Sequence, residues 1–270
     1  MRLRPLFLLL LILLGTTPVL SAEPIPSPDR LARVLQTKQL RVCIWPDYYG
    51  ISYRNPKTLQ LAGIDIDLAQ ELARDLGPEV RVEFVDTSFA RLIEDVTSDR
   101  CDIAMFAIGI TPARAEKLRF TQPHLQSDVY AVTTRSNRRV QGWADIDQPG
   151  VVVAVAKGTF HEPLMRERLR QARLVVLDTP FAREQEVESG RADVFMTDYP
   201  YSQRMLANSD WARLVAPPAT YHLTSYAYAM VPGDDRWHER VERFIGAIKQ
   251  DGRLLETARR HRLEIIAKFD

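Results

Sequence analysis

The sequence of 270 residues lacks the patterns that mark metal centres, redox sites and common hydrolases. Its five histidines are scattered and form no HExxH pair, and its two cysteines form no CxxC motif. It contains no GxSxG, no phosphate-binding loop and no GxGxxG. We therefore expect no catalytic residue of these types, no metal ion and no cofactor.

The chain also has little excess charge, with a formal net charge of +1, and only one long apolar run, over 6–14. This run follows Arg2 and Arg4 and precedes small residues ending at Ala22, which is typical of a cleavable signal peptide over 1–22. A membrane anchor would need about 20 apolar residues. Removing 1–22 changes the formal net charge from +1 to −1. We therefore expect export to the periplasm and no nucleic acid as partner. We also expect a monomer.

Beyond a proline-rich leader and short helix over 23–37, apolar periodicity alternates between strands and helices. A first unit has strands near 40–45, 80–85 and 101–110 with helices between them, and a second has strands near 150–156, 174–177 and 194–197 with helices near 161–171, 182–189 and 200–207. A strand at 226–231 and two helices complete the chain. This order predicts an α/β protein with parallel sheets in two units.

One helix of the first unit has a sequence signal at its start. We expect Ser88 to cap it, with the side chains of Phe89, Leu92, Ile93 and Val96 on its buried face.

The two cysteines, Cys43 and Cys101, both fall in predicted strands. An exported chain can oxidise them, but a disulfide needs Cα atoms within about 7 Å. Two small core residues explain the pattern equally well, so both interpretations stay open.

Ligands of open parallel sheets bind beyond the carboxyl ends of strands, and three such ends carry suitable residues. At the first, Thr111 and Pro112 predict a helix start that places Arg114 in the first turn. A guanidinium there opposes the helix dipole unless it meets an anion, and it holds a carboxylate through two parallel bonds. The alternatives are a solvated arginine and one paired with Glu116.

The other two strand ends carry Thr159 and Asp198. Thr159 and Glu162 form a possible capping box, and Gly158 could also expose backbone N–H groups to an anion. Asp198 either binds a ligand ammonium or caps the helix that follows it. Aromatic residues, Tyr48 and Phe89 among them, could enclose a ligand side chain, although Phe89 could equally be a core residue.

These residues resemble the family 3 bacterial solute-binding proteins, which bind polar amino acids and have the type II periplasmic-binding fold. The resemblance covers about 38–268 and rests on Gly63-Ile-Asp-Ile-Asp-Leu-Ala-Gln-Glu-Leu-Ala, Asp102-Ile-Ala, Ile110-Thr-Pro-Ala-Arg, Phe120-Thr-Gln-Pro, Val155-Ala-Lys-Gly-Thr, Arg191-Ala-Asp followed by Asp198, and Asp251-Gly252.

The resemblance implies a discontinuous first lobe over 38–128 plus 226–270, a second lobe over 129–225, and crossing strands near 125–132 and 223–229. It implies that Arg114 binds the α-carboxylate of an amino acid and Asp198 its amine. Gly109 would supply a backbone N–H, Thr159 would lie at the second-lobe helix start, and Tyr48 and Phe89 would stack on the ligand. The protein would deliver its ligand to the membrane subunits of an ABC transporter.

Three positions depart from the family pattern, namely Gly50-Ile51, Phe106-Ala107 and Gly109, and they indicate an unusual side-chain specificity. Two other functions stay open. Periplasmic cyclohexadienyl and arogenate dehydratases share this fold and resemble the segment 146–150, but they carry a glutamate general acid where this chain has Tyr201. An accessory protein of a periplasmic dehydrogenase is the other alternative.

Overall fold

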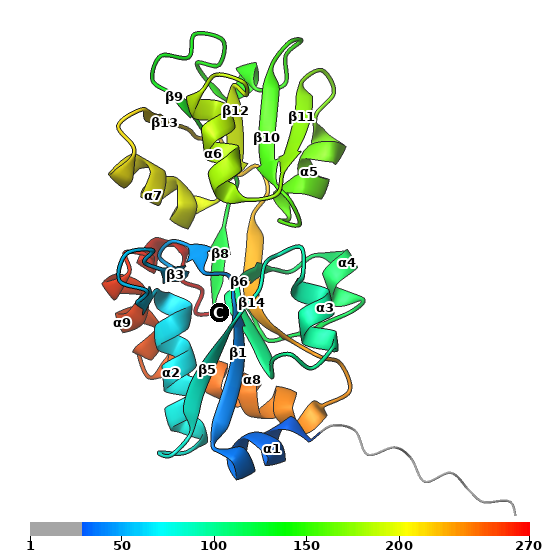
Figure 1. The fold of residues 1–270 in the computed structure, drawn as a ribbon, viewed down its shortest axis with the longest axis vertical. Coiled ribbons are helices and arrows are strands. Elements are labelled where there is room, and N and C mark those ends of the chain that lie inside the picture. The colour runs from blue at the N-terminus through cyan, green and yellow to red at the C-terminus, as the bar shows by residue number, and fades with distance from the viewer. Residues whose placement is uncertain (1–28) are drawn as a thin grey trace, which may run out of the picture.

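The computed structural model describes residues 29–270, so the predicted signal peptide over 1–22 and almost all of the leader lie outside the described residues. Figure 1 shows two α/β lobes stacked along the long axis and joined by two extended segments. The first lobe holds both ends of the described chain, and the second is built from its middle. No helix within 29–270 is long and apolar enough to cross a membrane.

The first lobe is built on a six-stranded sheet with the order β5-β1-β6-β14-β7, in which β8 also pairs with β14. Strand β1 pairs in parallel with β5 and β6, whereas β14 runs antiparallel to β6. Every residue of β6 is buried, as its continuous apolar sequence predicts. The strands are β1 (Gln39–Ile44), β5 (Arg81–Asp86), β6 (Ile103–Gly109), β7 (Arg119–Phe120), β8 (Leu125–Ser127) and β14 (Thr224–Met230).

Helices and a small second sheet complete the first lobe. In Figure 1, α2 and α3 lie on opposite sides of this lobe, and α1 and α8 lie at the end away from the second lobe. The helices are α1 (Arg30–Thr37), α2 (Ile64–Leu76), α3 (Leu92–Thr97), α4 (Pro112–Ala115), α8 (Asp235–Gln250) and α9 (Arg253–Arg260), with a 3-10 turn η2 (Glu264–Ile266). The small sheet has the order β2-β3-β4, formed by β2 (Asp47–Tyr48), β3 (Ser52–Arg54) and β4 (Leu61–Ala62).

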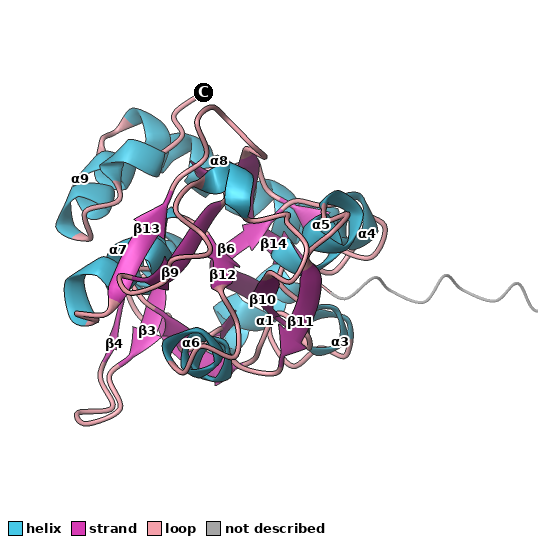
Figure 2. Cartoon of the chain, turned by 90° about the horizontal axis from the view of Figure 1, so that it is seen from above, coloured by secondary structure: helices cyan, strands magenta, loops and turns pink. Residues whose placement is uncertain are grey.

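The second lobe has a five-stranded sheet with the order β11-β10-β12-β9-β13. Its three parallel strands are those predicted, and β9 and β13 add antiparallel pairs. Seen from above, the strands of this lobe lie over β6 and β14 of the first lobe, with helices around them (Figure 2). The elements are β9 (Tyr130–Thr134), η1 (Trp143–Asp145), β10 (Val152–Ala156), α5 (His161–Arg168), β11 (Arg173–Leu177), α6 (Pro180–Glu188), β12 (Val194–Thr197), α7 (Tyr199–Asn208) and β13 (Ala212–Val215).

The two connections between the lobes are tied together at the point where they cross. Strands β8 and β14 pair antiparallel, with Ser127 opposite Thr224. Beyond this pair, the carboxylate of Asp128 accepts from the backbone N–H groups of Tyr221 and His222, at 2.8 and 2.7 Å. Any hinge motion of the lobes therefore involves both connections at once.

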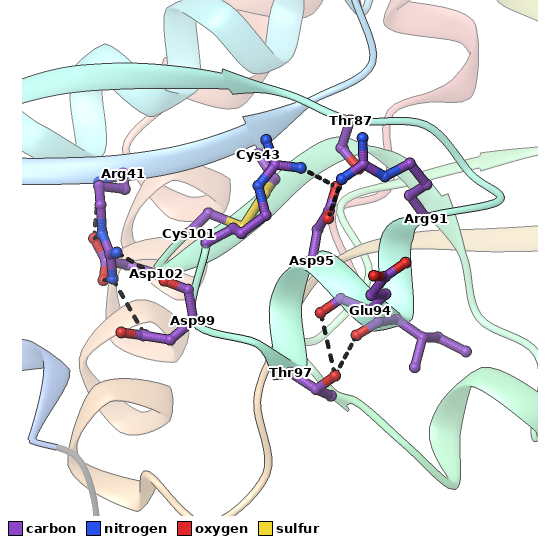
Figure 3. Close-up of a disulfide and its surroundings, with 12 residues drawn as sticks. Arg41, Cys43, Thr87, Arg91, Glu94, Asp95, Thr97, Asp99, Cys101 and Asp102 are labelled. Carbon is purple, nitrogen blue, oxygen red and sulfur yellow. Dashed lines mark hydrogen bonds and ion pairs between the residues drawn. A yellow bond between two sulfur atoms is a disulfide. The ribbon is translucent and has the colours of Figure 1, made fainter.

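The two cysteines form a disulfide, which decides the question that the sequence leaves open. Cys43 lies in β1 and Cys101 just before β6, with their Cα atoms 5.6 Å apart. Because β1 and β6 are neighbours in the sheet, the two residues meet although they are far apart in the chain. Figure 3 shows the disulfide between two charged clusters, with Asp102 and Asp99 bound to Arg41 on one side and Asp95 bound to Arg91 on the other.

Ser88 does not cap a helix, so that prediction is wrong. The chain makes a turn in which the Ser88 carbonyl accepts from Arg91 N, and α3 begins only at Leu92. As a result Ile93 points outward and is partly exposed, while Phe89 precedes the helix and packs toward the cleft between the lobes.

Candidate ligand-binding site

A cavity lies between the lobes at the carboxyl ends of their parallel strands. Its free volume is about 20 Å³, enough for about one water molecule. A ligand as large as an amino acid therefore enters only if the lobes part or side chains move. The lining comprises Trp45, Tyr48, Phe89 and Ala107 from the first lobe, and Thr159, Phe160, His161, Arg183, Thr197, Asp198 and Tyr201 from the second.

Arg114 stands beside this cavity as a buried cation. Thr111 caps α4 through its hydroxyl, which accepts from Arg114 N, and Pro112 is the first helical residue, as predicted. The side chain is 7% exposed, and burial lowers the pKa of its guanidinium to about 10. It donates to the carbonyls of Gly109 and Gly158, at 2.8 and 3.0 Å.

The predicted alternative partner of this arginine, Glu116, is not used. Within residues 29–270 the guanidinium of Arg114 contacts carbonyl oxygens and lies 5.2 Å from the ring centroid of Phe89, and no carboxylate forms an ion pair with it. A buried guanidinium whose charge is opposed only by carbonyl dipoles favours an anion beside it.

Two glycines bring the backbone of both lobes to Arg114. The resemblance assigns a ligand-facing N–H to Gly109, but the contact that Gly109 makes here is through its carbonyl. Gly158 has a φ of +76°, and a Cβ there would lie 2.5 Å from the backbone nitrogen of Ala90. Only glycine therefore allows the lobes to approach this closely.

The capping box predicted for Thr159 and Glu162 does not form. The Thr159 hydroxyl donates to the Ala156 carbonyl at 2.7 Å, and the Glu162 carboxylate accepts from Gly158 N at 3.0 Å. The Gly158 N–H is thus satisfied by a carboxylate of its own lobe and is not free for a ligand anion. Helix α5 begins at His161, and Thr159 still lines the cavity at the helix start, as expected.

Asp198 caps α7, which is one of its two predicted roles, and its side chain also faces the cavity, where the predicted ammonium role would require it. Its Oδ1 accepts from Tyr201 N at 3.2 Å, while its Oδ2 accepts from the hydroxyls of Tyr226, at 2.9 Å, and Tyr48. The side chain is 2% exposed, and burial raises the pKa of its carboxyl. No Lys, Arg or His within 29–270 forms an ion pair with this carboxylate, which leaves it suited to an ammonium group.

The predicted rings of Tyr48 and Phe89 belong to a larger aromatic wall. Trp45 contacts both of them edge to face, with centroids 5.2 and 5.0 Å away, and Phe89 contacts Phe106 at 4.9 Å. Phe106 is fully buried behind the wall, so this departure from the family pattern fills space that a smaller residue would leave.

The first acid of the Gly-Ile-Asp-Ile-Asp segment supports this wall from behind. Asp65 is fully buried, and its carboxylate accepts from Ala107 N at 2.7 Å and from the Tyr228 hydroxyl at 2.8 Å. Ala107 has a φ of +46°, which is rare for a residue with a side chain. Asp65 thus holds in place a strained residue that lines the cavity.

Sequence reasoning missed the second-lobe residues His161 and Arg183. A signal for Arg183 was present, because Thr179-Pro180 caps α6 as Thr111-Pro112 caps α4, and each start carries an arginine in or near its first turn. Both starts lie at the carboxyl ends of parallel strands, where ligands bind.

Comparison with known proteins agrees with this architecture. The model of the bacterial extracellular solute-binding proteins, family 3, matches residues 40–263. The chain belongs to this family. Its predicted type II periplasmic-binding fold is also that of the ancestral amino acid-binding protein AncCDT-1, a precursor of cyclohexadienyl dehydratase. That structure is 29% identical with a TM-score of 0.78, over 86% of this chain and 98% of the other.

Relatives of this family 3 protein include both an enzyme and binding proteins. Cyclohexadienyl dehydratase of Pseudomonas aeruginosa is 33% identical, over 87% of each chain. The putative ABC transporter arginine-binding protein 2 of Escherichia coli is 23% identical, over 77% of this chain and 83% of that one. An L-arginine-bound substrate-binding protein of Streptococcus pneumoniae, 23% identical over 88% of this chain and all of the other, shares the fold with a TM-score of 0.78.

Proposed function

We propose that this family 3 protein captures an α-amino acid between its lobes in the periplasm and delivers it to an ABC transporter. The observation that carries the proposal is the buried cation of Arg114 and the buried carboxyl of Asp198, neither of which has an ion-pair partner within 29–270. An α-carboxylate and an α-ammonium are complementary to this pair. The disulfide and the signal-like segment over 1–22 both fit an exported protein.

The test is calorimetric titration of the purified protein with amino acids chosen by a thermal-shift screen. Arg114→Ala should weaken binding ~10- to 100-fold, because hydrogen bonds to a charged group are lost. Lys117→Ala, an exposed cation of the same turn, is the matched control and should bind as the parent does. Unchanged affinity in Arg114→Ala would remove the carboxylate role from this residue.

A dehydratase is the second candidate, favoured by the 33% identity to cyclohexadienyl dehydratase. Its chemistry needs a group that protonates a leaving hydroxyl. Tyr201 stands at the cavity, but its hydroxyl donates to Glu184, and burial raises its pKa further above the ordinary value. Such a phenol is a weak general acid near neutral pH, which disfavours dehydration here.

The two candidates separate in one assay. Purified protein is incubated with prephenate or arogenate, and the aromatic product is followed by absorbance. Turnover by the purified parent would establish the enzyme, and its loss in Tyr201→Phe would assign the acid to Tyr201. Tight amino-acid binding without turnover supports the binding protein.

A further inference from the structure

Arg183 is a second buried cation of the cavity, and it has fewer partners than Arg114. Its side chain is 2% exposed, and one nitrogen, Nη1, donates to the Met196 carbonyl at 3.0 Å. Its Nε and Nη2 have no hydrogen-bond partner within residues 29–270. The guanidinium lies 4.4 and 4.7 Å from the ring centroids of Phe195 and Tyr201, which stabilise its charge but satisfy no N–H.

His161 lines the same cavity and is 5% exposed. Neither ring nitrogen makes a hydrogen bond of good geometry within 29–270, although the backbone of Thr197 lies close enough to act on the ring. Burial, with Arg183 nearby, lowers the pKa of this imidazole to about 3. The ring is therefore neutral at physiological pH and offers one N–H donor.

Unsatisfied buried donors are costly, and polar groups of this kind in a cleft are usually satisfied by what binds there. The Nε and Nη2 atoms of Arg183 carry three N–H groups between them, and these are open to an acceptor at the wall that His161 shares. Asp198 does not supply it, because this carboxylate binds Tyr48, Tyr226 and Tyr201 N and forms no ion pair with Arg183.

The charges of the cavity indicate what the acceptor is. Arg114 and Arg183 bring two positive charges, and Asp198 brings one negative charge when ionised. The α-carboxylate and α-ammonium of an amino acid would neutralise Arg114 and Asp198 and leave Arg183 uncompensated. A further carboxylate at the other end of the ligand would balance it and accept from its free N–H groups.

We propose that Arg183, with His161 beside it, binds a second, distal carboxylate of the ligand, so that this protein selects a dicarboxylic amino acid. This inference rests on the amino-acid function proposed above. Cationic amino acids are excluded by the same residue, because their side chains would add a second uncompensated positive charge to a buried site.

The test compares acids with their neutral amides on the parent protein by calorimetry. L-Aspartate and L-glutamate should bind at least 10-fold more tightly than L-asparagine and L-glutamine, and L-arginine should not bind. Equal affinity for an acid and its amide, or tighter binding of L-arginine, would overturn the proposal without any variant.

Arg183→Met keeps the bulk of the side chain and removes its charge. The variant should bind the preferred acid no more tightly than the corresponding amide. Its affinity for the amide should stay within about 3-fold of that of the parent protein. Arg213→Met, which removes a cation of the same lobe bound to the carbonyls of Val140 and Gln141, is the control and should change neither. Retained preference for the acid in a folded Arg183→Met protein would also overturn the proposal.

Dicarboxylates without an amine separate this inference from the function on which it rests. If 2-oxoglutarate or succinate binds and Arg183→Met abolishes that binding while amino acids fail, the distal site stands and the amino-acid function falls. If neutral amino acids bind and no dicarboxylate does, the amino-acid function stands and the distal site falls.

Discussion

The hydroxyl of Tyr48 in the first lobe donates a hydrogen bond to the carboxylate of Asp198 in the second. Together with the bond from Arg114 to the Gly158 carbonyl, it joins the lobes across the cavity. Closure of this protein is therefore supported in part by its own side chains.

Tyr48→Phe should loosen this closed arrangement, because one interlobe hydrogen bond is lost. The radius of gyration of the unliganded protein in small-angle X-ray scattering should rise, and affinity should fall ~3- to 10-fold as the closed fraction declines. Tyr49→Phe alters a partly exposed ring next to it and serves as the control. Identical scattering and affinity for Tyr48→Phe would contradict the role of this bond.

Ligand affinity should depend on the protonation of Asp198. Burial raises the pKa of this carboxyl, so a proton competes with a ligand ammonium at a higher pH than it would at an ordinary aspartate, near 3.9. Affinity should be full above the raised pKa and fall as the pH drops through it, and binding should release a proton. Calorimetry in buffers of different ionisation enthalpy measures this release.

Asp198→Asn should remove both the proton release and the loss of affinity at acidic pH, at the cost of weaker binding. A dicarboxylate without an amine should release no proton from this residue. Amino-acid affinity that stays constant down to about pH 4 would argue against an ammonium at Asp198.

Gly158→Ala should keep the lobes apart, since its Cβ would lie 2.5 Å from the nitrogen of Ala90. We expect affinity to fall at least ~10-fold, because a smaller fraction of the protein reaches the closed, binding-competent state. Gly190→Ala provides a matched control, because Gly190 has the same φ of +76° and nothing within 4 Å of the added carbon. Both variants should lose a similar ~1–2 kcal/mol of folding free energy. Equal ligand affinities of the Gly158→Ala and Gly190→Ala variants would show that Gly158 does not limit closure.

Removal of the Cys43–Cys101 disulfide should destabilise the protein by ~2–4 kcal/mol, because it closes a long loop in the unfolded chain. Chemical denaturation of the Cys43→Ser, Cys101→Ser double variant measures the loss. Dithiothreitol should lower the stability of the parent to that of the double variant and leave the double variant unchanged. A reductant effect on the double variant would point to another cause.

Apolar periodicity located the parallel strands of both lobes and most of their helices, and Thr111 and Pro112 located the start of α4. The periodicity did not indicate the small β2-β3-β4 sheet or the antiparallel strands β9 and β13. Local pattern failed at Ser88 and at Thr159, where the chain turns before the helix and the expected cap hydroxyl lies elsewhere. A capping motif specifies residue types, whereas the geometry of the preceding turn decides which bond forms.

The candidate site could be predicted where a residue stood against the trend of its element. Arg114 opposes a helix dipole, and Asp198 follows a buried strand. Arg183 follows a Thr-Pro helix start like the one before Arg114, but it lies among charged residues of α6, which is the pattern of a solvated helix. Its burial depends on Phe195 and Tyr201 from other elements. The disulfide depended on sheet order, which places β1 beside β6.

The late position of β14 in the chain has a consequence for biosynthesis. This strand pairs with β6, β7 and β8, so the sheet of the first lobe stays incomplete until residues after 223 have emerged. All strands of the second-lobe sheet precede β14 in the chain, so that sheet can assemble while the tail is still being made. In the first lobe, strands from early in the chain pair with β14 near its end. Such long-range pairings form slowly. We therefore expect the sheet of the first lobe to be completed after that of the second.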